Sequence, residues 1–314
     1  MQSSFMGSLM ELAEQDKNVL YLTSDSGEGG LDLMFRNNFP KQVYDFGIAE
    51  QSVVAAAAGL ALSGKIPFVY TAAPFLVYRA YEFIRDDVCL QNVPVKMAGS
   101  GSGISVSSLG PTHHSTEDVA LLRCLPNLKI LSPATPSQAF LCVKEAYKHT
   151  GPVYIRLGMN REKEYFGDDY SLTSGSEIMT QSDGIMTQGT DVVILSTGGI
   201  LEEVMNAAAA LKNEGVGATV INVVSIKPFE FEGIEDIIVR SRLICTVEEH
   251  NVIGGLGSIV AEHMMDKGIV RPLLKLGLED RFTKGYGKLH QVRIENGLDD
   301  NTIAQRILQR IKEI

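Results

Sequence analysis

The chain has 314 residues, of which 45% are hydrophobic and 21% charged, and its formal net charge is −10 at pH 7. Because single hydrophobic cores stop growing near this length, two domains are expected. The acidic balance argues against a nucleic-acid partner, since binding a phosphate backbone requires an excess of Lys and Arg.

Cysteine usage and the N-terminal region indicate a cytoplasmic protein. The cysteines are scattered among apolar residues with no C-x-x-C pair, which favours reduced, buried thiols over disulfides or zinc ligands. They are Cys89, Cys124, Cys142 and Cys245. The N-terminus lacks a basic, apolar leader, and no stretch approaches the roughly 20 apolar residues of a membrane span. We expect a soluble protein with no membrane partner.

Short apolar runs alternate with helical patterns in the first half of the chain. The predicted strands are NVLYLT (18–23), IPFVYT (66–71), VPVKMAG (93–99), LKILSP (128–133) and PVYIRLG (152–158). The predicted helices cover residues 50–63, 76–91, 116–124 and 136–148. This alternation predicts a doubly wound α/β domain, a parallel sheet with helices on both faces.

The pattern breaks near Glu164, where polar residues, Gly and Ser take over until about Gly189. Beyond it the predicted strands cover 191–199, 218–226 and 242–249, and the predicted helices cover 201–214, 232–240, 257–267 and 301–313. We therefore predict a first domain over 1–165, a linker over 166–189 and a smaller α/β domain with a mixed sheet over 190–314.

Glu50 is the first candidate for chemistry. It follows the strand-like QVYDF segment in the stretch D-F-G-I-A-E-Q and opens a helix, which is where open α/β sheets present ligand-binding groups. A glutamate in the first turn of a helix is also favoured by the helix dipole alone. The residues by themselves leave both interpretations open.

Five further candidate residues, in three segments, have ordinary structural explanations as well. His113 and His114 lie in G-P-T-H-H near a helix start, where a histidine is commonly a structural group. Phe75 and Tyr78 have a spacing typical of aromatic residues in a helix core. Asp25, in T-S-D-S-G, could cap the turn into the next segment.

The motifs together resemble the transketolase and deoxyxylulose-phosphate synthase family. D-F-G-I-A-E-Q, G-P-T-H-H with the following R-C-L-P-N-L, and E-E-H-N-V-I-G-G-L-G-S all match it. The resemblance covers the whole chain, with residues 1–165 similar to the pyrimidine-binding domain and 190–314 to the C-terminal domain. It implies thiamine diphosphate as cofactor and transfer of a two-carbon ketol unit from a ketose to an aldose.

The resemblance also assigns roles to the candidates. Glu50 is expected to hydrogen-bond the pyrimidine ring of the cofactor and to favour its imino tautomer, and His113 to face the reacting carbon of the donor. Phe75 and Tyr78 would form the wall against the pyrimidine, and Asp25 would lie near the cofactor across a subunit interface. Residues expected to face the substrate are His114, Ser102, Arg156 and Arg161.

One part of the family pattern is absent. The G-D-G segment with its downstream asparagine, which holds Mg²⁺ on the cofactor diphosphate, has no counterpart in this sequence. We therefore expect no metal site on this chain, a partner chain that carries the diphosphate-binding half and most of the Mg²⁺ contacts, and an assembly with two copies of each chain.

Three positions depart from ordinary sugar-phosphate transketolases. Leu109 replaces an acidic residue that reads a donor hydroxyl, Gly101 replaces a basic residue, and Met159 replaces a phosphate-binding arginine. Contacts of charged groups with phosphate are among the strongest in a pocket, so this loss predicts a specialised ketose substrate. Arg156, Arg161 or the partner chain could supply the missing charge.

Three alternative functions remain. A 2-oxo acid dehydrogenase β subunit has the same two domains, and a deoxyxylulose-phosphate synthase-like subunit would use pyruvate and release CO₂. A non-catalytic paralogue could keep the fold without the chemistry, although it would have no use for a base, a histidine and an aromatic wall together.

Overall fold

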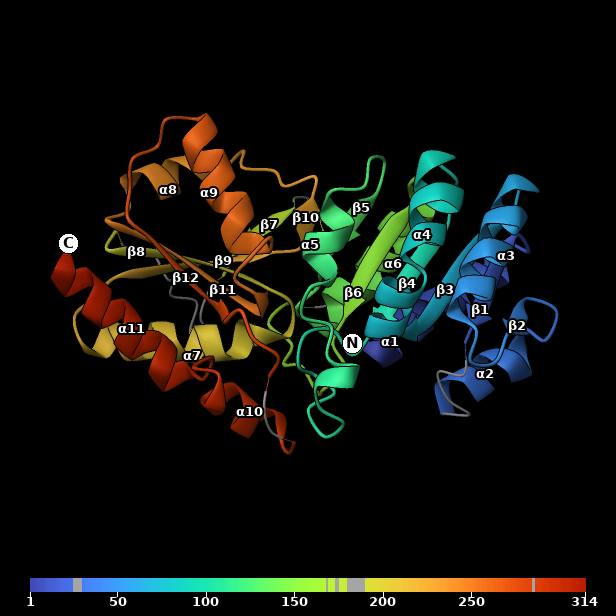
Figure 1. Ribbon diagram of the computed structural model, residues 1–314, viewed down its shortest axis with the longest axis horizontal. Coiled ribbons are helices and arrows are strands. Elements are labelled where there is room, and N and C mark those ends of the chain that lie inside the picture. The colour runs from blue at the N-terminus through green and yellow to red at the C-terminus, as the bar shows by residue number, and fades with distance from the viewer. Residues whose placement is uncertain (25–29, 168, 173–174, 180–189, 284–285) are drawn as a thin grey trace.

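The computed structural model describes residues 1–24, 30–167, 169–172, 175–179, 190–283 and 286–314. It consists of two α/β units that lie side by side along the long axis of the molecule (Figure 1). The first unit contains the N-terminus and the second contains the C-terminus.

The first unit is built on a seven-stranded sheet in the order β10-β5-β6-β4-β3-β1-β2. Its strands are β1 (Val19–Thr23), β2 (Val43–Asp45), β3 (Ile66–Ala72), β4 (Lys96–Ser100), β5 (Lys129–Leu131), β6 (Val153–Leu157) and β10 (Ser225–Lys227). All pairings are parallel except that of β10 with β5. The strands β1, β4 and β6 are buried throughout, as expected for strands covered on both faces.

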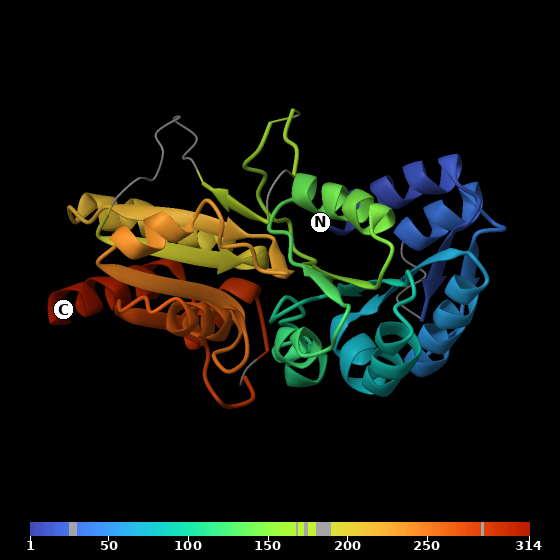
Figure 2. The same ribbon diagram turned by 90° about the horizontal axis from the view of Figure 1, so that it is seen from above.

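Helices cover both faces of this sheet (Figure 2). One face carries α1 (Gln2–Gln15), α2 (Gly30–Asn38) and α6 (Pro136–Lys148). The other carries α3 (Glu50–Leu62), α5 (Asp118–Arg123) and a helical segment made of η1 (Phe75–Arg79), α4 (Tyr81–Phe83) and η2 (Ile84–Leu90), in which η1 and η2 are π-helical turns. The predicted doubly wound α/β arrangement is confirmed.

The second unit has a five-stranded sheet in the order β12-β11-β8-β9-β7. Its strands are β7 (Ser176–Ile178), β8 (Val192–Thr197), β9 (Ala218–Val223), β11 (Leu243–Asn251) and β12 (Leu273–Leu278). The helices α7 (Leu201–Asn213), α10 (Leu289–Glu295) and α11 (Asp300–Glu313) pack on one face, and α8 (Glu235–Arg240) and α9 (Leu256–Asp266) on the other. Because β7 is antiparallel to β9, the predicted mixed sheet is confirmed.

The predicted strand over 218–226 is two strands. The chain leaves the second sheet after Val223, and β10 then pairs with β5 in the first sheet. Since one sheet thus contains strands from both halves of the sequence, the two units are joined by more than a linker. The domain bounds 1–165, 166–189 and 190–314 stay a prediction.

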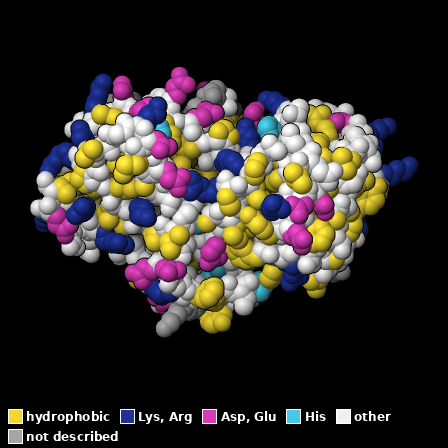
Figure 3. All heavy atoms as spheres, turned by 45° about the horizontal axis from the view of Figure 1, so that its top comes forward, with side chains coloured by type: hydrophobic (Ala, Val, Ile, Leu, Met, Phe, Trp, Pro, Cys, Tyr) yellow, Lys and Arg dark blue, Asp and Glu magenta, His cyan; other side chains and the backbone are white. Residues whose placement is uncertain are grey.

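Two further expectations can be compared with the structure. Cys89, Cys142 and Cys245 are buried, but Cys124 is exposed at the end of α5, so the prediction of a buried thiol was wrong for it. Within the described ranges, no helix is both long and apolar enough to cross a bilayer. The face shown in Figure 3 carries acidic and basic side chains interspersed with hydrophobic ones.

Candidate active site

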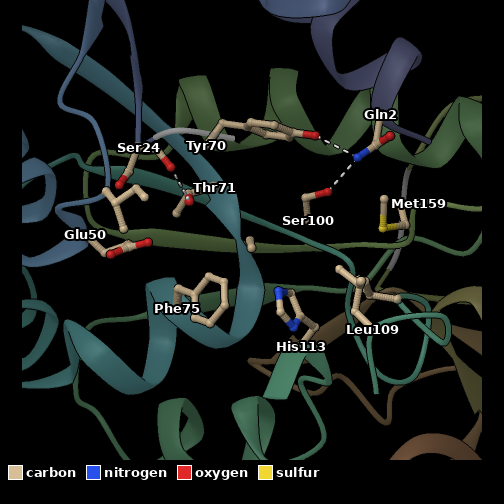
Figure 4. A pocket seen from close by; sticks show the side chains of 13 residues that line it. Gln2, Ser24, Glu50, Tyr70, Thr71, Phe75, Ser100, Leu109, His113 and Met159 are labelled. Atoms are coloured by element: carbon tan, nitrogen blue, oxygen red, sulfur yellow. Dashed lines mark hydrogen bonds between the residues drawn. The ribbon is translucent and has the colours of Figure 1, made fainter. Parts of the chain in front are cut away.

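A cavity of about 360 Å³ opens at the carboxyl ends of the parallel strands of the first sheet. It is lined by Gln2, Ser24, Ile48, Glu50, Tyr70, Thr71, Ala72, Phe75, Ser100, Val106, Leu109, His113 and Met159 (Figure 4). Carboxyl ends of parallel strands are the usual ligand edge of an open α/β sheet. The sheet therefore brings together three of the predicted residues, Glu50, Phe75 and His113.

Glu50 is positioned by the turn that precedes α3. Gly47 has a φ of +62°, which favours glycine, and the Ser24 hydroxyl holds the turn from the end of β1. That hydroxyl donates to the Gly47 carbonyl at 2.6 Å and accepts from the Ala49 amide at 3.0 Å. Glu50 is 2% exposed at the N-terminus of α3, where the helix dipole favours a carboxylate.

Arg79 is the ionic partner of Glu50. Its Nη1 donates to the Glu50 carboxylate at 2.6 Å, and its guanidinium lies 5.2 Å from the centre of the Phe75 ring. Arg79 is 41% exposed, whereas Glu50 is buried, so the pair reaches from the cavity towards the surface. This end of the cavity thus combines a buried acid with an aromatic wall.

His113 lies on the side of Phe75 away from Glu50 in the view of Figure 4 and ends the short helix η3 (Pro111–His113). The two rings are in edge-to-face contact, with centroids 5.1 Å apart and an interplanar angle of 75°. Thr112 Oγ1 lies 3.0 Å from His113 Nδ1. None of the described residues hydrogen-bonds His113 Nε2, so that nitrogen is available for a ligand.

The loop that carries His113 is held by the second unit. Ser107 Oγ donates to the Gly287 carbonyl at 2.8 Å, and His114 Nδ1 lies 2.6 Å from Thr283 Oγ1. Gly110 has a φ of +74°, and a Cβ at this position would approach the Tyr286 ring to 2.3 Å. The geometry of this loop therefore depends on residues from both units.

His114 is buried and is not among the residues that line the cavity. Burial lowers its pKa below the ordinary 6.5, with Glu249 opposing the shift. The substrate role predicted for His114 has no support in this geometry, because its ring is turned to Thr283.

Tyr78 also lies away from the cavity. Its hydroxyl donates to Glu117 Oε2 at 2.7 Å and accepts from the Glu117 amide at 3.1 Å. Burial, together with Asp118 and Glu117, raises the pKa of the Tyr78 phenol. The hydroxyl thus joins η1 to the start of α5, and Phe75 alone of the two predicted aromatic residues forms the cavity wall.

Arg156 is a structural cation. It is 2% exposed, its Nε donates to both carboxylate oxygens of Asp118 at 2.9 and 3.1 Å, and its Nη2 donates to the carbonyls of Ser115 and Glu249. A guanidinium enclosed in this way is not presented to a substrate, so the predicted substrate role has no support here.

The remaining candidates lie outside the cavity lining or outside the described residues. Ser102 is buried, with its amide donating to the Leu157 carbonyl, and Arg161 is exposed beyond β6. Asp25 lies outside the described residues. No cluster of His, Cys, Asp or Glu within the described part of the chain could hold a metal ion.

Gln2, Tyr70 and Ser100 are cavity residues that sequence reasoning missed. Gln2 Nε2 donates to Tyr70 Oη at 2.8 Å and to Ser100 Oγ at 2.6 Å, as Figure 4 shows. Gln2 comes from α1, which packs mainly against α6, and the tertiary packing of this helix brings Gln2 to the ends of β3 and β4. Its local sequence carried no signal of this position.

Comparisons with known proteins agree over both units. The family described as "Transketolase, pyrimidine binding domain" matches residues 1–161, and "Transketolase, C-terminal domain" matches residues 184–303. An apulose-4-phosphate transketolase subunit of Actinobacillus succinogenes is 36% identical over 93% of this chain and 92% of its own length.

Two further relatives are also similar along nearly their full length. The 6-deoxy-6-sulfo-D-fructose transketolase subunit SqwH of a Clostridium species is 32% identical over 90% of this chain and 85% of its own. The solved structure of a split gene transketolase, described as an inactive beta4 tetramer, superposes with a TM-score of 0.86. It is 32% identical, and the alignment covers 99% of this chain and 97% of that one.

Proposed function

Because this chain belongs to the transketolase family, we propose that it is the pyrimidine-binding subunit of a split, thiamine diphosphate-dependent transketolase. One observation carries the proposal. Glu50, Phe75 and His113 come from three separate segments of the chain and share one cavity at the ligand edge of the sheet. A paralogue retained only as a scaffold would not need this combination.

The cavity suits the pyrimidine half of the cofactor. Phe75 offers an apolar face for a flat ring, and offset stacking of aromatic rings contributes about 0.5–1.5 kcal/mol beyond buried area. Glu50 offers a buried carboxylate as the acceptor for a ring N–H. When bound, thiamine diphosphate supplies the electron sink that permits cleavage of the bond between C2 and C3 of the ketose.

The residues of this chain then have distinct tasks. Glu50 would accept a hydrogen bond from the cofactor ring and hold the proton there, which is general acid–base catalysis by a buried carboxylate. His113 faces the donor carbonyl oxygen, where an N–H stabilises the developing negative charge. Phe75 lies between the two groups and offers its ring as the apolar wall of the cavity.

A partner chain completes the active site in this proposal. The described residues hold no acidic cluster for Mg²⁺, so the diphosphate and its metal are assigned mainly to the partner. Ile48, which borders the cavity, is 73% exposed, and Leu33 and Met34 on α2 are 53% and 50% exposed. We assign these apolar side chains to the interfaces of a dimer of heterodimers in the cytoplasm.

The proposed reaction is transfer of a two-carbon ketol unit from a non-standard ketose to an aldose. Two similar subunits are named for apulose 4-phosphate and 6-deoxy-6-sulfo-D-fructose, and neither is an ordinary pentose phosphate. In this chain, Leu109 and Met159 both line the cavity where the family's donor-reading groups are expected. Because apolar side chains replace the charged ones at these two positions, we expect a donor that differs from an ordinary pentose phosphate.

A donor panel tests the proposal. The chain and its genetically adjacent partner would be combined with thiamine diphosphate, Mg²⁺, phosphorylated and unphosphorylated ketoses, and pyruvate, with an aldose as acceptor. We expect ketol transfer from a ketose without CO₂ release. Release of CO₂ from pyruvate would instead identify a synthase-like or 2-oxo acid dehydrogenase-like subunit, and the absence of any cofactor dependence would identify a non-catalytic paralogue.

A further inference from the structure

We propose that Arg79 is a positioning residue for the cofactor, because it holds one carboxylate oxygen of Glu50 and so aims the other at the pyrimidine ring. Arg79 is not among the residues that line the cavity, so it acts on the cofactor through Glu50. The inference rests on the proposed function and deepens it, since it assigns a task to a side chain outside the cavity lining.

The two carboxylate oxygens of Glu50 have different surroundings. Oε2 accepts a hydrogen bond from Arg79 Nη1 at 2.6 Å, whereas Oε1 hydrogen-bonds none of the described residues. Glu50 lines the cavity although it is only 2% exposed. A hydrogen bond between a guanidinium and a carboxylate is among the strongest in proteins, so the bond at Oε2 restricts rotation of the carboxylate. Oε1 is then the acceptor that remains for a ring N–H.

Arg79 is held from a second side by the aromatic wall of the cavity. Its guanidinium lies 5.2 Å from the centre of the Phe75 ring, and a cation is attracted to the face of such a ring. Both residues belong to η1, whose π-helical turn is wider than an α-helical one because its hydrogen bonds run from residue i to i+5. Residues four apart therefore lie nearly one turn apart, so a single turn of backbone positions the wall and the partner of Glu50.

Tyr78, the residue before Arg79, fixes η1 to the segment that precedes α5. Its hydroxyl donates to Glu117 Oε2 at 2.7 Å and accepts from the Glu117 amide at 3.1 Å. The hydroxyl of Thr116 in turn donates to Glu117 Oε1 at 2.7 Å. A residue that positions another needs a support of this kind, because a catalytic group is held in place only when its neighbours are fixed as well.

No second cation in the described part of the chain pairs with Glu50. Arg85, which follows on η2, is 63% exposed and pairs with Asp86 instead. Loss of the Arg79 side chain therefore leaves the Glu50 carboxylate without its anchor, while Phe75 and the backbone of α3 stay in place. Arg85 offers the matched control, because it is a neighbouring arginine of the same helical segment with no contact to Glu50.

The test separates binding of the cofactor from its activation. The chain and its partner are combined with thiamine diphosphate and Mg²⁺ in D₂O, and exchange of the thiazolium C2 proton is followed by NMR after acid quenching. The dissociation constant of the cofactor is measured by titration calorimetry. Arg79→Leu should slow exchange per bound cofactor at least about tenfold, because the acceptor of the ring proton is no longer aimed. It should raise the dissociation constant less than about threefold, because the diphosphate contacts are unchanged.

A purely structural role would lower the amount of bound cofactor but not the exchange rate per bound cofactor. Arg79→Lys keeps a cation beside Glu50 and should recover part of the rate, whereas Arg85→Leu should leave the rate and the dissociation constant unchanged. If Arg79→Leu does not assemble, Arg79→Gln replaces it and should also slow exchange.

Two outcomes contradict the inference in different ways. Wild-type exchange per bound cofactor in Arg79→Leu or Arg79→Gln overturns the positioning role and leaves the proposed function intact. If the unsubstituted complex does not accelerate exchange over the free cofactor, the proposed function fails and the role of Arg79 fails with it.

Discussion

The guanidinium of Arg79 donates a 2.6 Å hydrogen bond to the buried carboxylate of Glu50. In the chain without its cofactor, Arg79 thus gives the Glu50 carboxylate a partner. A buried carboxylate without a partner would destabilise the fold. The side chain that is proposed to bind the pyrimidine therefore already has an ionic partner on one of its two carboxylate oxygens.

The first prediction concerns this pair in the isolated chain. Arg79→Leu should lower the free energy of unfolding by about 1–3 kcal/mol, because it leaves the Glu50 carboxylate buried without its donor. Adding Glu50→Gln should recover much of that loss, since a neutral amide needs no counter-charge. Urea unfolding of the wild type, both single variants and the double variant gives the coupling. Additive effects would contradict the energetic coupling between Arg79 and Glu50.

The second prediction concerns Thr283, a residue of the second unit that contacts His114 at 2.6 Å and so positions the His113 loop. Thr283→Val should reduce kcat of the assembled enzyme by about ten- to a hundredfold through misplacement of His113, with a smaller effect on KM. Thr283→Ser restores the hydroxyl and should restore kcat. If Thr283→Val lowers only the melting temperature and leaves kcat intact, the segment is merely structural.

The third prediction is a pH dependence of stability from Lys96. Its Nζ donates to the carbonyls of His149 and Gly151, each at 2.6 Å, and burial together with Lys129 lowers its pKa to about 7. Between about pH 7 and 10.5 the unfolded chain therefore binds one more proton than the folded chain. The free energy of unfolding should rise with pH in this window, by up to about 1.4 kcal/mol per unit.

Lys96→Met tests this linkage. The difference in unfolding free energy between wild type and Lys96→Met should grow in favour of the wild type from pH 7 to pH 9. Lys17→Met, at an exposed position, should show a constant difference over the same range. Parallel curves for wild type and Lys96→Met would mean that the amine keeps an ordinary pKa in the fold.

The fourth prediction follows from the exposure of Cys124. A thiol reagent added to the native chain should react quickly with one of the four cysteines, because Cys89, Cys142 and Cys245 are buried and burial raises their pKa values. Cys124→Ser should abolish the fast phase and leave three thiols that react after denaturation. Two or more fast thiols in the native wild type would contradict the packing.

Much of the fold was predictable because its elements follow local periodicity. Most of the buried parallel strands are short, mainly apolar runs, and helices such as α1, α6 and α7 carry apolar residues at a 3.6-residue period. The break after Val223, where β10 crosses to the first sheet, was not predictable, because 218–226 contains no Gly or Pro to mark a break and pairing across units is a tertiary effect. The helix α1 was detectable from the spacing of Phe5, Leu9 and Leu12, although the N-terminal segment was considered only as a possible leader.

The site was predictable where residues are close to a motif and not where distant elements meet. Glu50 and His113 were found through their neighbours in sequence, and the structure places both at the cavity. Gln2 was missed because it reaches the cavity through the tertiary packing of α1, which the sequence around it does not show. The pairing of Arg156 with buried Asp118 was not predictable, because the sequence does not show whether a strand arginine faces a ligand or a carboxylate from another element.

The most direct test of the account is ketol transfer by the reconstituted enzyme with Glu50 intact or replaced. The chain alone should be inactive, and the chain with its partner, thiamine diphosphate and Mg²⁺ should transfer a two-carbon unit from a ketose. Glu50→Gln should lower that rate by about 10²–10⁴-fold without loss of assembly, and Glu82→Gln, on the exposed side of α4, should not. Full activity in Glu50→Gln, or ketol transfer by the chain without its partner, would contradict the central claim.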